Sequence, residues 1–368
     1  MIYHLFQLLK DYDIPGQGLM SYLSFRAMLA SVTAMLISFF AGRRIIRWLQ
    51  KKQIGETIRD LGLEGQMQKK GTPTMGGVII ILAITVPVLL FCDLTNIYTQ
   101  LLLFTTLWCG GIGFADDYIK VFKHNKEGMS ERGKLILQIL LGVIVGLTVC
   151  FNNDIVVREK VNVAEASNGT TYLPQGSSDL DVDSETIVSS SGWKMENIVK
   201  STKTTIPFVK NHEFDYKWLS PFQGAWGWYC KWAIYVLMIV IVITACSNGT
   251  NLTDGMDGLA AGSSAIVGIV IGIIAWLSGN LINSNYLNIM YIPGSGEVAV
   301  FMSIFVGALF GFLWYNSYPA QVFMGDTGSL AIGGIIGVSA ILIRKELLLP
   351  MLCGIFFVES LSVLIQRF

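Results

Sequence analysis

Residues 259–278 read LAAGSSAIVGIVIGIIAWLS, a run of apolar and small residues without a single charged side chain. A segment of this length and composition predicts a helix that crosses the hydrocarbon core of a membrane. Further apolar segments lie on both sides of it, near residues 22–42, 77–92, 98–115, 135–151, 232–247, 297–314, 329–343 and 347–366. We therefore predict an all-α polytopic membrane protein with nine transmembrane helices in this chain.

The composition excludes an ordinary soluble protein. Of the 368 residues, 52% are hydrophobic and only 14% are charged, whereas about 25% are charged in soluble domains. The formal net charge is zero, so no global basic surface indicates nucleic-acid binding. The six cysteines are dispersed without a Cys-x-x-Cys motif, which argues against a thiolate metal site. Cys150 and Cys230 bracket a polar segment, and whether they form a disulfide is left open.

Glycines recur inside the apolar segments at a spacing of four residues. The pairs are Gly142 and Gly146, Gly268 and Gly272, Gly307 and Gly311, and Gly333 and Gly337. Small residues at this spacing share one face of a helix and let membrane helices approach closely. We predict close helix contacts at these four pairs.

Basic residues predict the orientation and the domains. Eight lysines and arginines fall between the first two spans and five between the third and fourth, so both loops are predicted to be cytoplasmic. Residues 1–151 then hold spans one to four with these loops. Residues 152–231 form an external (periplasmic) polar loop or small β-rich subdomain, in which we expect substitutions to be mild. Residues 232–368 hold spans five to nine with two acidic, glycine-rich cytoplasmic loops.

Acidic residues stand out in the second half of the chain. No Lys or Arg occurs from residue 232 to 343, yet four acids do: Asp254, Asp257, Glu297 and Asp326. The three aspartates adjoin glycine in NLTDGMDG (251–258) and MGDTG (324–328), on the predicted cytoplasmic side. Glu297 lies on the outer side and is an ordinary helix-start acid. Uncompensated carboxylates at a membrane boundary are costly, which predicts a bound divalent cation.

A third acidic cluster, Asp116 and Asp117 in GFADDYIK (113–120), lies on the same side. Successive helical residues point about 100° apart, so one carboxylate can face a metal ion while the other faces a cation, for which Lys120 is the nearest candidate. We expect all three clusters to converge on one site. Carboxylate oxygens without Cys or His favour Mg²⁺ or Mn²⁺, and Mg²⁺ commonly binds substrate phosphates as well. A phosphate ester substrate follows, with Lys69 and Lys70 before GTPTMGG (71–77) as phosphate-binding candidates.

The same loops carry a family resemblance. KKGTPTMGG, FADDYIKV, NGTNLTDGMDGLAAG, FLWYNSYPAQVFMGDTGSLA and VESLSVLIQ occur in this order. The chain resembles the phospho-N-acetylmuramoyl-pentapeptide transferase family, within the polyprenyl-phosphate hexosamine-1-phosphate transferase superfamily. The resemblance covers every predicted cytoplasmic loop and most spans. It implies a ten-helix, Mg²⁺-dependent enzyme that transfers phospho-MurNAc-pentapeptide from UDP-MurNAc-pentapeptide to undecaprenyl phosphate, giving lipid I and UMP for peptidoglycan synthesis.

The resemblance also implies site residues, partners and location. The catalytic positions are Asp116, Asp117 and Asp326, and the metal positions are Asp326 and Asp117. The substrate-binding residues that we expect are Lys70, Thr74, Lys120, Asn248, Asn251, Asp254, Asp257, Asn316 and Phe323, of which Phe323 matches the aromatic residue that stacks on uracil. Expected partners are the two substrates and membrane lipid, without nucleic acid, and a homodimer is left open. The enzyme is expected in the bacterial inner membrane, with its active site on the cytoplasmic face.

Two departures from the family pattern and two rival functions stay open. The family continues with a histidine-rich loop and a tenth helix, so we expect a truncated C-terminus after Phe368 and little or no activity of this chain. The insertion at 152–231 is longer than the external hairpin of the family. A related transferase would use another UDP-sugar. An ion-coupled transporter would need acids in mid-span, whereas these lie at span ends.

Overall fold

The structure is a computed structural model that describes residues 1–8, 17–51, 71–123, 125, 128–162, 193–207, 213–222 and 224–367. Its long helices are α2 (Leu23–Lys51), α3 (Gly77–Phe91), α4 (Ile97–Phe122), α5 (Glu131–Phe151), α7 (Gly224–Thr253), α8 (Leu259–Ser278), α10 (Gly296–Asn316), α11 (Gly325–Leu342) and α13 (Gly354–Arg367). The short ones are α1 (Ile2–Leu8), α9 (Leu281–Tyr286), α12 (Leu349–Leu352), η1 (Gln17–Ser21), η3 (Tyr216–Leu219) and η4 (Glu346–Leu348).

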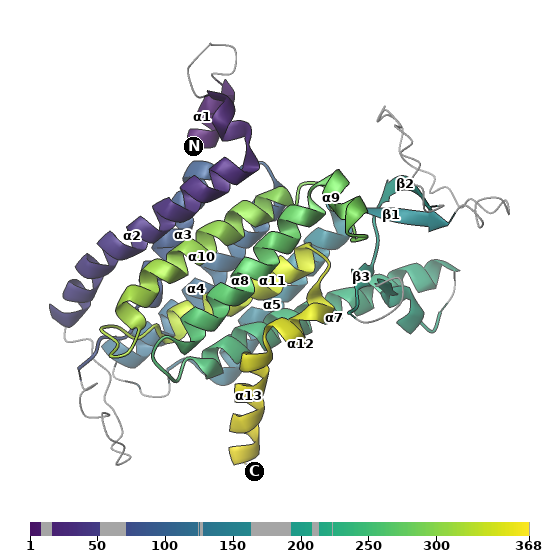
Figure 1. The fold of residues 1–368 in the computed structure, drawn as a ribbon. Helices are drawn as coiled ribbons and strands as arrows, with labels where there is room; N and C mark the ends of the chain where they lie inside the picture. Colours follow the sequence, from purple (N-terminus) through teal and green to yellow (C-terminus); the bar gives the residue numbers. More distant parts are fainter. Residues whose placement is uncertain are drawn as a thin grey trace.

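Each apolar segment predicted to span a membrane is helical. Within the described residues, seven helices are long and apolar enough to cross a membrane, and the bent pair Glu346–Leu352 and Gly354–Val363 would make an eighth. The helices of that pair meet at 72°, and α13 leaves the bundle in Figure 1. Helix α3 is apolar but has only 15 residues. The predicted class, an all-α polytopic membrane protein, is confirmed, and the count of nine spans stays a prediction.

Helices α10 and α11 form the centre of the bundle (Figure 1). In α11, 89% of the candidate span is buried inside the protein, against 22% in α2. Helix α11 packs against α3, α4, α7 and α8, and α10 packs against α2, α3 and α8. A helix enclosed in this way can place polar groups at its ends without exposing them to lipid. Asp326 lies in the first turn of α11.

The predicted glycine contacts are confirmed. At all eight positions of the four pairs, an added Cβ atom would lie within 3.4 Å of a residue on another helix. Gly307 and Gly311 of α10 face the backbone of α2, and Gly142 and Gly146 of α5 face Val240 and Val236 of α7. Close backbone approach therefore holds the bundle together, as expected for helices that associate in lipid.

One helix crossing reaches the predicted acidic site. A Cβ atom on Gly113 of α4 would lie less than 3.0 Å from the backbone of Asp326 and Thr327. Gly113 is also one helical turn before Asp117, on the same face of α4. The carboxylate of Asp117 can reach the start of α11 because the backbones of α4 and α11 almost touch here.

The polar insertion forms two small antiparallel sheets at one end of the bundle (Figure 1). Strand β1 (Val157–Asn162) pairs with β2 (Trp193–Val199), and β3 (Lys203–Thr205) pairs with β4 (Glu213–Asp215). The segment between β1 and β2, 163–192, lies outside the described residues. All six cysteines are free thiols, so the bond considered between Cys150 and Cys230 is not formed.

Strand β3 and the turn after β4 cover three buried charged residues just beyond α11, Arg344 to Glu346. The Thr205 amide and the Thr204 hydroxyl donate to the Arg344 carbonyl at 3.0 and 3.1 Å, and Tyr216 donates to Glu346 at 3.3 Å. Burial lowers the pKa of Lys345 to about 8, against the opposing effect of Glu346. The insertion therefore donates hydrogen bonds to the backbone carbonyl of Arg344 and to the carboxylate of Glu346.

Glu297 lies in the first turn of α10, as expected for a helix-start acid. It is buried, it forms an ion pair with Arg26 of α2, and its second oxygen accepts the Asp93 amide at 3.0 Å. Asp93 lies between α3 and α4, so this ion pair ties three parts of the bundle together. Arg26 was not expected as its partner, because 271 residues separate the two in the chain.

We expect Gly113→Ala to destabilise the bundle by about 1–3 kcal/mol, because the new methyl group pushes α4 from α11. Gly111→Ala on the same helix is the matched control, since nothing lies within 4 Å of its added Cβ atom. The measurement is the thermal midpoint of each variant in detergent. Equal midpoints for the two variants would contradict the assigned crossing.

We expect Tyr216→Ala to cost about 2–4 kcal/mol, because a large buried ring is lost and Glu346 loses a donor. This revises, for Tyr216, the expectation that substitutions in the insertion are mild. Trp218→Ala two residues later is the control, since Trp218 is 70% exposed and Tyr216 2%. If heating unfolds both variants at the same temperature, the insertion does not brace the bundle.

Candidate active site

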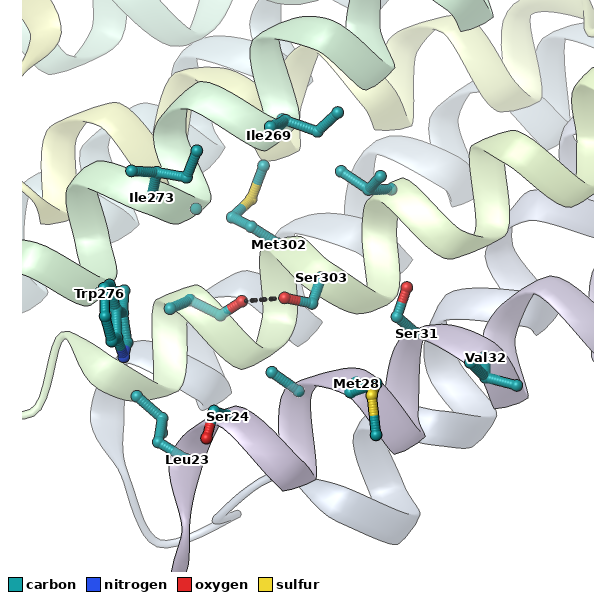
Figure 2. A pocket seen from close by; sticks show the side chains of 15 residues that line it. Leu23, Ser24, Met28, Ser31, Val32, Ile269, Ile273, Trp276, Met302 and Ser303 are labelled. Carbon is teal, nitrogen blue, oxygen red and sulfur yellow. Dashed lines mark hydrogen bonds between the residues drawn. The ribbon is translucent and has the colours of Figure 1, made fainter.

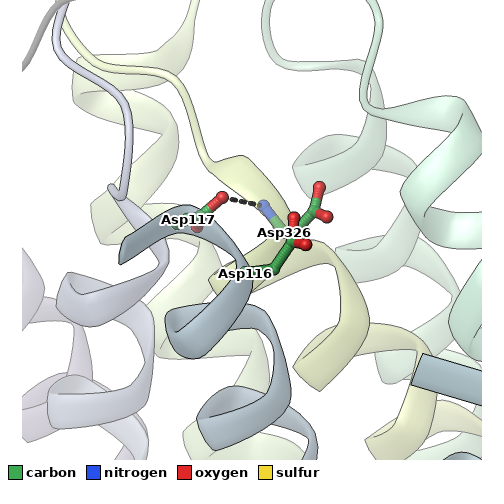
Figure 3. A group of neighbouring side chains, drawn as sticks. All are labelled: Asp116, Asp117 and Asp326. Atoms are coloured by element: carbon green, nitrogen blue, oxygen red, sulfur yellow. Dashed lines mark hydrogen bonds between the residues drawn. The ribbon is translucent and has the colours of Figure 1, made fainter. Parts of the chain in front are cut away.

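Three carboxylates meet at the end of the bundle where α4 ends and α11 begins (Figure 3). Asp116 and Asp117 lie near the end of α4, and Asp326 lies in the first turn of α11. One oxygen from each lies within 4.8 Å of the others. Asp116 is fully buried, Asp117 is 5% exposed and Asp326 is half-buried. Such a triad could hold a metal ion, and two of the predicted acidic clusters therefore converge.

Asp117 is fixed by the first amides of α11. Its Oδ1 accepts the Asp326 amide at 3.2 Å, and its Oδ2 accepts the Thr327 amide at 2.9 Å and the Thr327 hydroxyl at 2.5 Å. Met324, at the N-cap position of α11, offers no side-chain hydrogen bond. Asp117, on α4, therefore acts as the hydrogen-bond acceptor that caps the start of α11. Its negative charge suits the N-terminal end of the helix dipole.

Two lysines lie between the carboxylates of Asp116 and Asp326. The ammonium group of Lys120 lies 2.6 Å from Asp116 Oδ2 and 3.1 Å from Asp326 Oδ2. That of Lys134, on α5, lies 2.9 and 2.7 Å from the same two atoms. The Met129 amide donates to Asp116 Oδ1 at 2.7 Å. The predicted pairing of Lys120 with the acids is confirmed, and Lys134 is an addition.

The charges of these groups nearly balance. Three carboxylates and two ammonium groups leave a net charge of −1 in a partly buried space. Burial strengthens each attraction and makes any unpaired charge costly. The donors are hard carboxylate oxygens, the type that Mg²⁺ and Mn²⁺ prefer. Residual negative charge and ligand type therefore fit a divalent cation.

The end of α7 and the loop after it contribute unevenly to this site. Asn251 donates to Asp326 Oδ1 and to the Ser329 hydroxyl, both at 2.9 Å. Asp257 accepts the Ala320 amide at 3.2 Å, away from the triad. Within the described part of the chain, neither Asp254 nor Asp257 belongs to the carboxylate group that could hold a metal. The expectation that three acidic clusters meet therefore holds for two of them.

Asn316 and Asn248 have their amides engaged within the scaffold. Asn316 is buried, accepts the Gly258 amide at 3.1 Å and donates to the Val322 carbonyl at 3.0 Å. Asn248 pairs with Gln138 of α5, which sequence reasoning did not single out. Their expected substrate contacts stay predictions. The sequence did contain a signal for these two residues. Lys134 and Gln138 are spaced by four near the start of α5, which indicates a polar face on that helix.

Two of the expected substrate-binding residues, Phe323 and Thr74, lie in adjoining loops. Phe323 is half-buried, its amide donates to the Pro73 carbonyl at 2.9 Å, and its carbonyl accepts the Gly76 amide at 2.8 Å. The loop that carries Thr74 therefore runs beside residues 322–324, and Thr74 is half-buried within it. Lys70 lies outside the described residues, so its expected phosphate contact stays a prediction.

A separate groove of about 430 Å³ opens between α2, α8 and α10 (Figure 2). Its lining is mainly apolar, with Met28, Ile269, Ile273, Trp276 and Met302 among the side chains drawn. No residue of the acidic site lines it. The groove suits hydrocarbon and lies apart from the chemistry at the acidic site.

The chain matches known proteins along its whole length. Residues 195–344 match the model of glycosyl transferase family 4, and residues 69–81 match the phospho-N-acetylmuramoyl-pentapeptide-transferase signature 1. Proteins named phospho-N-acetylmuramoyl-pentapeptide-transferase from Parabacteroides distasonis and Flavobacterium psychrophilum are each 53% identical, and one from Porphyromonas gingivalis is 51% identical. The matches cover 100% of this chain and 83%, 86% and 83% of those relatives. The chain therefore belongs to the phospho-N-acetylmuramoyl-pentapeptide-transferase family.

Proposed function

We propose that this protein transfers phospho-MurNAc-pentapeptide from UDP-MurNAc-pentapeptide to undecaprenyl phosphate, with release of UMP and formation of lipid I. The observation that carries the proposal is the convergence of Asp116, Asp117 and Asp326 within 4.8 Å at one end of a membrane bundle. The relatives at about 50% identity bear the name of this transferase. A phosphoryl transfer between two anionic substrates needs such a charged centre.

The main task of the site is to bring anions together. A phosphate monoester has a second pKa of about 6, so the lipid phosphate is largely ionised at neutral pH and needs no strong base. The ammonium groups of Lys120 and Lys134 face the site and supply positive charge for the diphosphate of the donor. Mg²⁺, held by Asp326 and Asp117, would neutralise further phosphate charge when bound.

The carboxylates have different surroundings, which favours direct attack by the lipid phosphate. Asp117 accepts three hydrogen bonds from α11, and these stabilise its charge and reduce its reactivity as a nucleophile. Asp116 Oδ2 lies between two ammonium groups. We infer that Asp116 holds the two lysines in place and that Asp117 fixes the start of α11. A covalent aspartyl intermediate is the competing route.

Basic residues nearby support a cytoplasmic location of the site. Arg43, Arg44 and Arg47 are exposed near the end of α2, and the Tyr315 hydroxyl at the end of α10 donates to the Phe39 carbonyl of α2 at 2.7 Å. The end of α2 and the loop that leads to Asp326 are thus at the same end of the bundle. By the positive-inside rule this end faces the cytoplasm. We propose an active site at the cytoplasmic face of the bacterial inner membrane.

We expect Asp326→Asn to lower Mg²⁺-dependent transfer by roughly 100-fold or more while the protein remains inserted. The variant loses a charged metal ligand, and Lys120 and Lys134 lose one of their two carboxylate partners. The measurement is formation of lipid-linked product per inserted protein, with each UDP-sugar donor tested in turn. Glu131→Gln, an exposed acid at the start of α5, is the control. Near-normal turnover of Asp326→Asn would refute the metal assignment, and preference for another UDP-sugar would favour a related transferase.

We expect exchange of labelled UMP into UDP-MurNAc-pentapeptide to require undecaprenyl phosphate, because direct attack leaves no phospho-sugar on the enzyme. The measurement is radiolabel in the UDP-substrate pool with and without the lipid phosphate. Asp117→Asn serves as the inactive control. Exchange at full rate in the absence of lipid would favour the covalent route.

A further inference from the structure

Gln138 of α5 lies in a polar layer directly beneath the acidic site. It is 1% exposed, and its amide nitrogen donates to Ser247 Oγ at 3.2 Å and to Asn248 Oδ1 at 3.3 Å. Asn248 Nδ2 donates back to Gln138 Oε1 at 2.9 Å. The Ser247 hydroxyl continues the layer by donating to the Leu330 carbonyl of α11 at 3.2 Å. One glutamine thus links α5 to α7 and, through Ser247, to α11.

This layer repeats the site one helical turn deeper. On α5, Gln138 follows Lys134 by four residues. On α11, Leu330 follows Asp326 by four. On α7, which runs in the opposite direction, Asn248 precedes Asn251 by three. Residues three and four apart lie on the same helix face, so the partners of Gln138 lie directly below the groups that contact Asp326.

The other contacts between α5 and α7 do little to prevent one helix from sliding along the other. Gly142 and Gly146 of α5 lie against the aliphatic side chains of Val240 and Val236. Apolar contacts are non-directional, whereas paired amides have fixed donors and acceptors. The hydrogen bonds of Gln138 with Asn248 and Ser247 therefore supply directional contacts that specify the register between α5 and α7 near the site.

We propose that Gln138 is a positioning residue, which holds Lys134 and Asn251 at Asp326 by fixing the register of α5, α7 and α11. The structure pairs Asn248 with Gln138, and the expected contact of Asn248 with substrate stays a separate prediction. The effect on turnover rests on the proposed transfer function. The effect of Gln138 on the surroundings of Lys134 does not depend on that function.

Gln138→Leu keeps the side-chain size approximately and removes all three hydrogen bonds of the amide. We expect turnover per folded protein to fall by roughly tenfold or more, as for partners that orient the groups at a reacting centre, with a smaller change in KM for the UDP-substrate. The exchanged pair Gln138→Asn with Asn248→Gln retains both amides and the summed length, and should recover most of the loss. Thr148→Val at the far end of α5, where the hydroxyl only meets the Ile144 carbonyl, should leave turnover unchanged.

Lysine labelling reports position without substrate. In the unsubstituted protein Lys134 lies between two carboxylates, so an amine-reactive reagent should modify it slowly, as measured by peptide mass spectrometry. Gln138→Leu should raise this rate several-fold over Thr148→Val. An unchanged labelling rate would overturn the inference, as would unchanged turnover in the folded fraction of an active enzyme. If Gln138→Leu and Asn248→Leu lower turnover multiplicatively in the double variant, the two amides act separately and the pairing role is wrong. Faster labelling in a protein without transferase activity would reject the proposed function alone.

Discussion

Charge balance at the acidic end of the bundle is the constraint on which the surrounding structure depends. Asp116, Asp326, Lys120 and Lys134 share a space in which each ammonium group lies within 3.1 Å of both carboxylates. They come from α4, α5 and α11. Movement of α5 would remove Lys134 from both carboxylates, and movement of α11 would remove Asp326 from both lysines. Unpairing charges in a partly buried site is far costlier than losing a surface ion pair. The groups available for catalysis are also the groups that lock the helices together.

Glycine makes this arrangement sterically possible. Asp117 reaches the amides of Asp326 and Thr327 because Gly113, one turn earlier on α4, allows the two backbones to approach. Gly77, at the start of α3, meets Gly328 of α11 in the same way. A larger side chain at Gly113 would separate α4 from α11 before the Asp117 carboxylate could bond, and one at Gly77 would separate α3 from α11. Gly113 and Asp117, one helical turn apart, thus act together: the glycine allows the close approach and the acid forms the hydrogen bonds.

The residues predicted from sequence are those whose signal is local. Apolar length identifies the spans, the spacing of Gly142 and Gly146 identifies a contact face, and acids at the ends of spans indicate Asp116, Asp117 and Asp326. Lys134 and Gln138 were missed because their importance depends on how α5 is rotated toward α7 and α11, which its own sequence does not specify. Arg26 pairs with a residue 271 positions away, which no local pattern indicates. The amide of Asn316 likewise joins two loops, which its motif did not indicate, and its expected contact with substrate stays a prediction.

Helix α11 connects the acidic site to the opposite end of the protein. Its 18 residues extend for about 27 Å at 1.5 Å per residue, with Asp117 bonded at its start and Thr204 and Thr205 bonded to the Arg344 carbonyl just beyond its end. Both attachments are directional hydrogen bonds, while most of the contact between them is apolar and glycine-rich. Displacement of α11 along its axis would break both attachments at once. The insertion therefore supports the position of Asp326 from a distance, through a helix held at both ends.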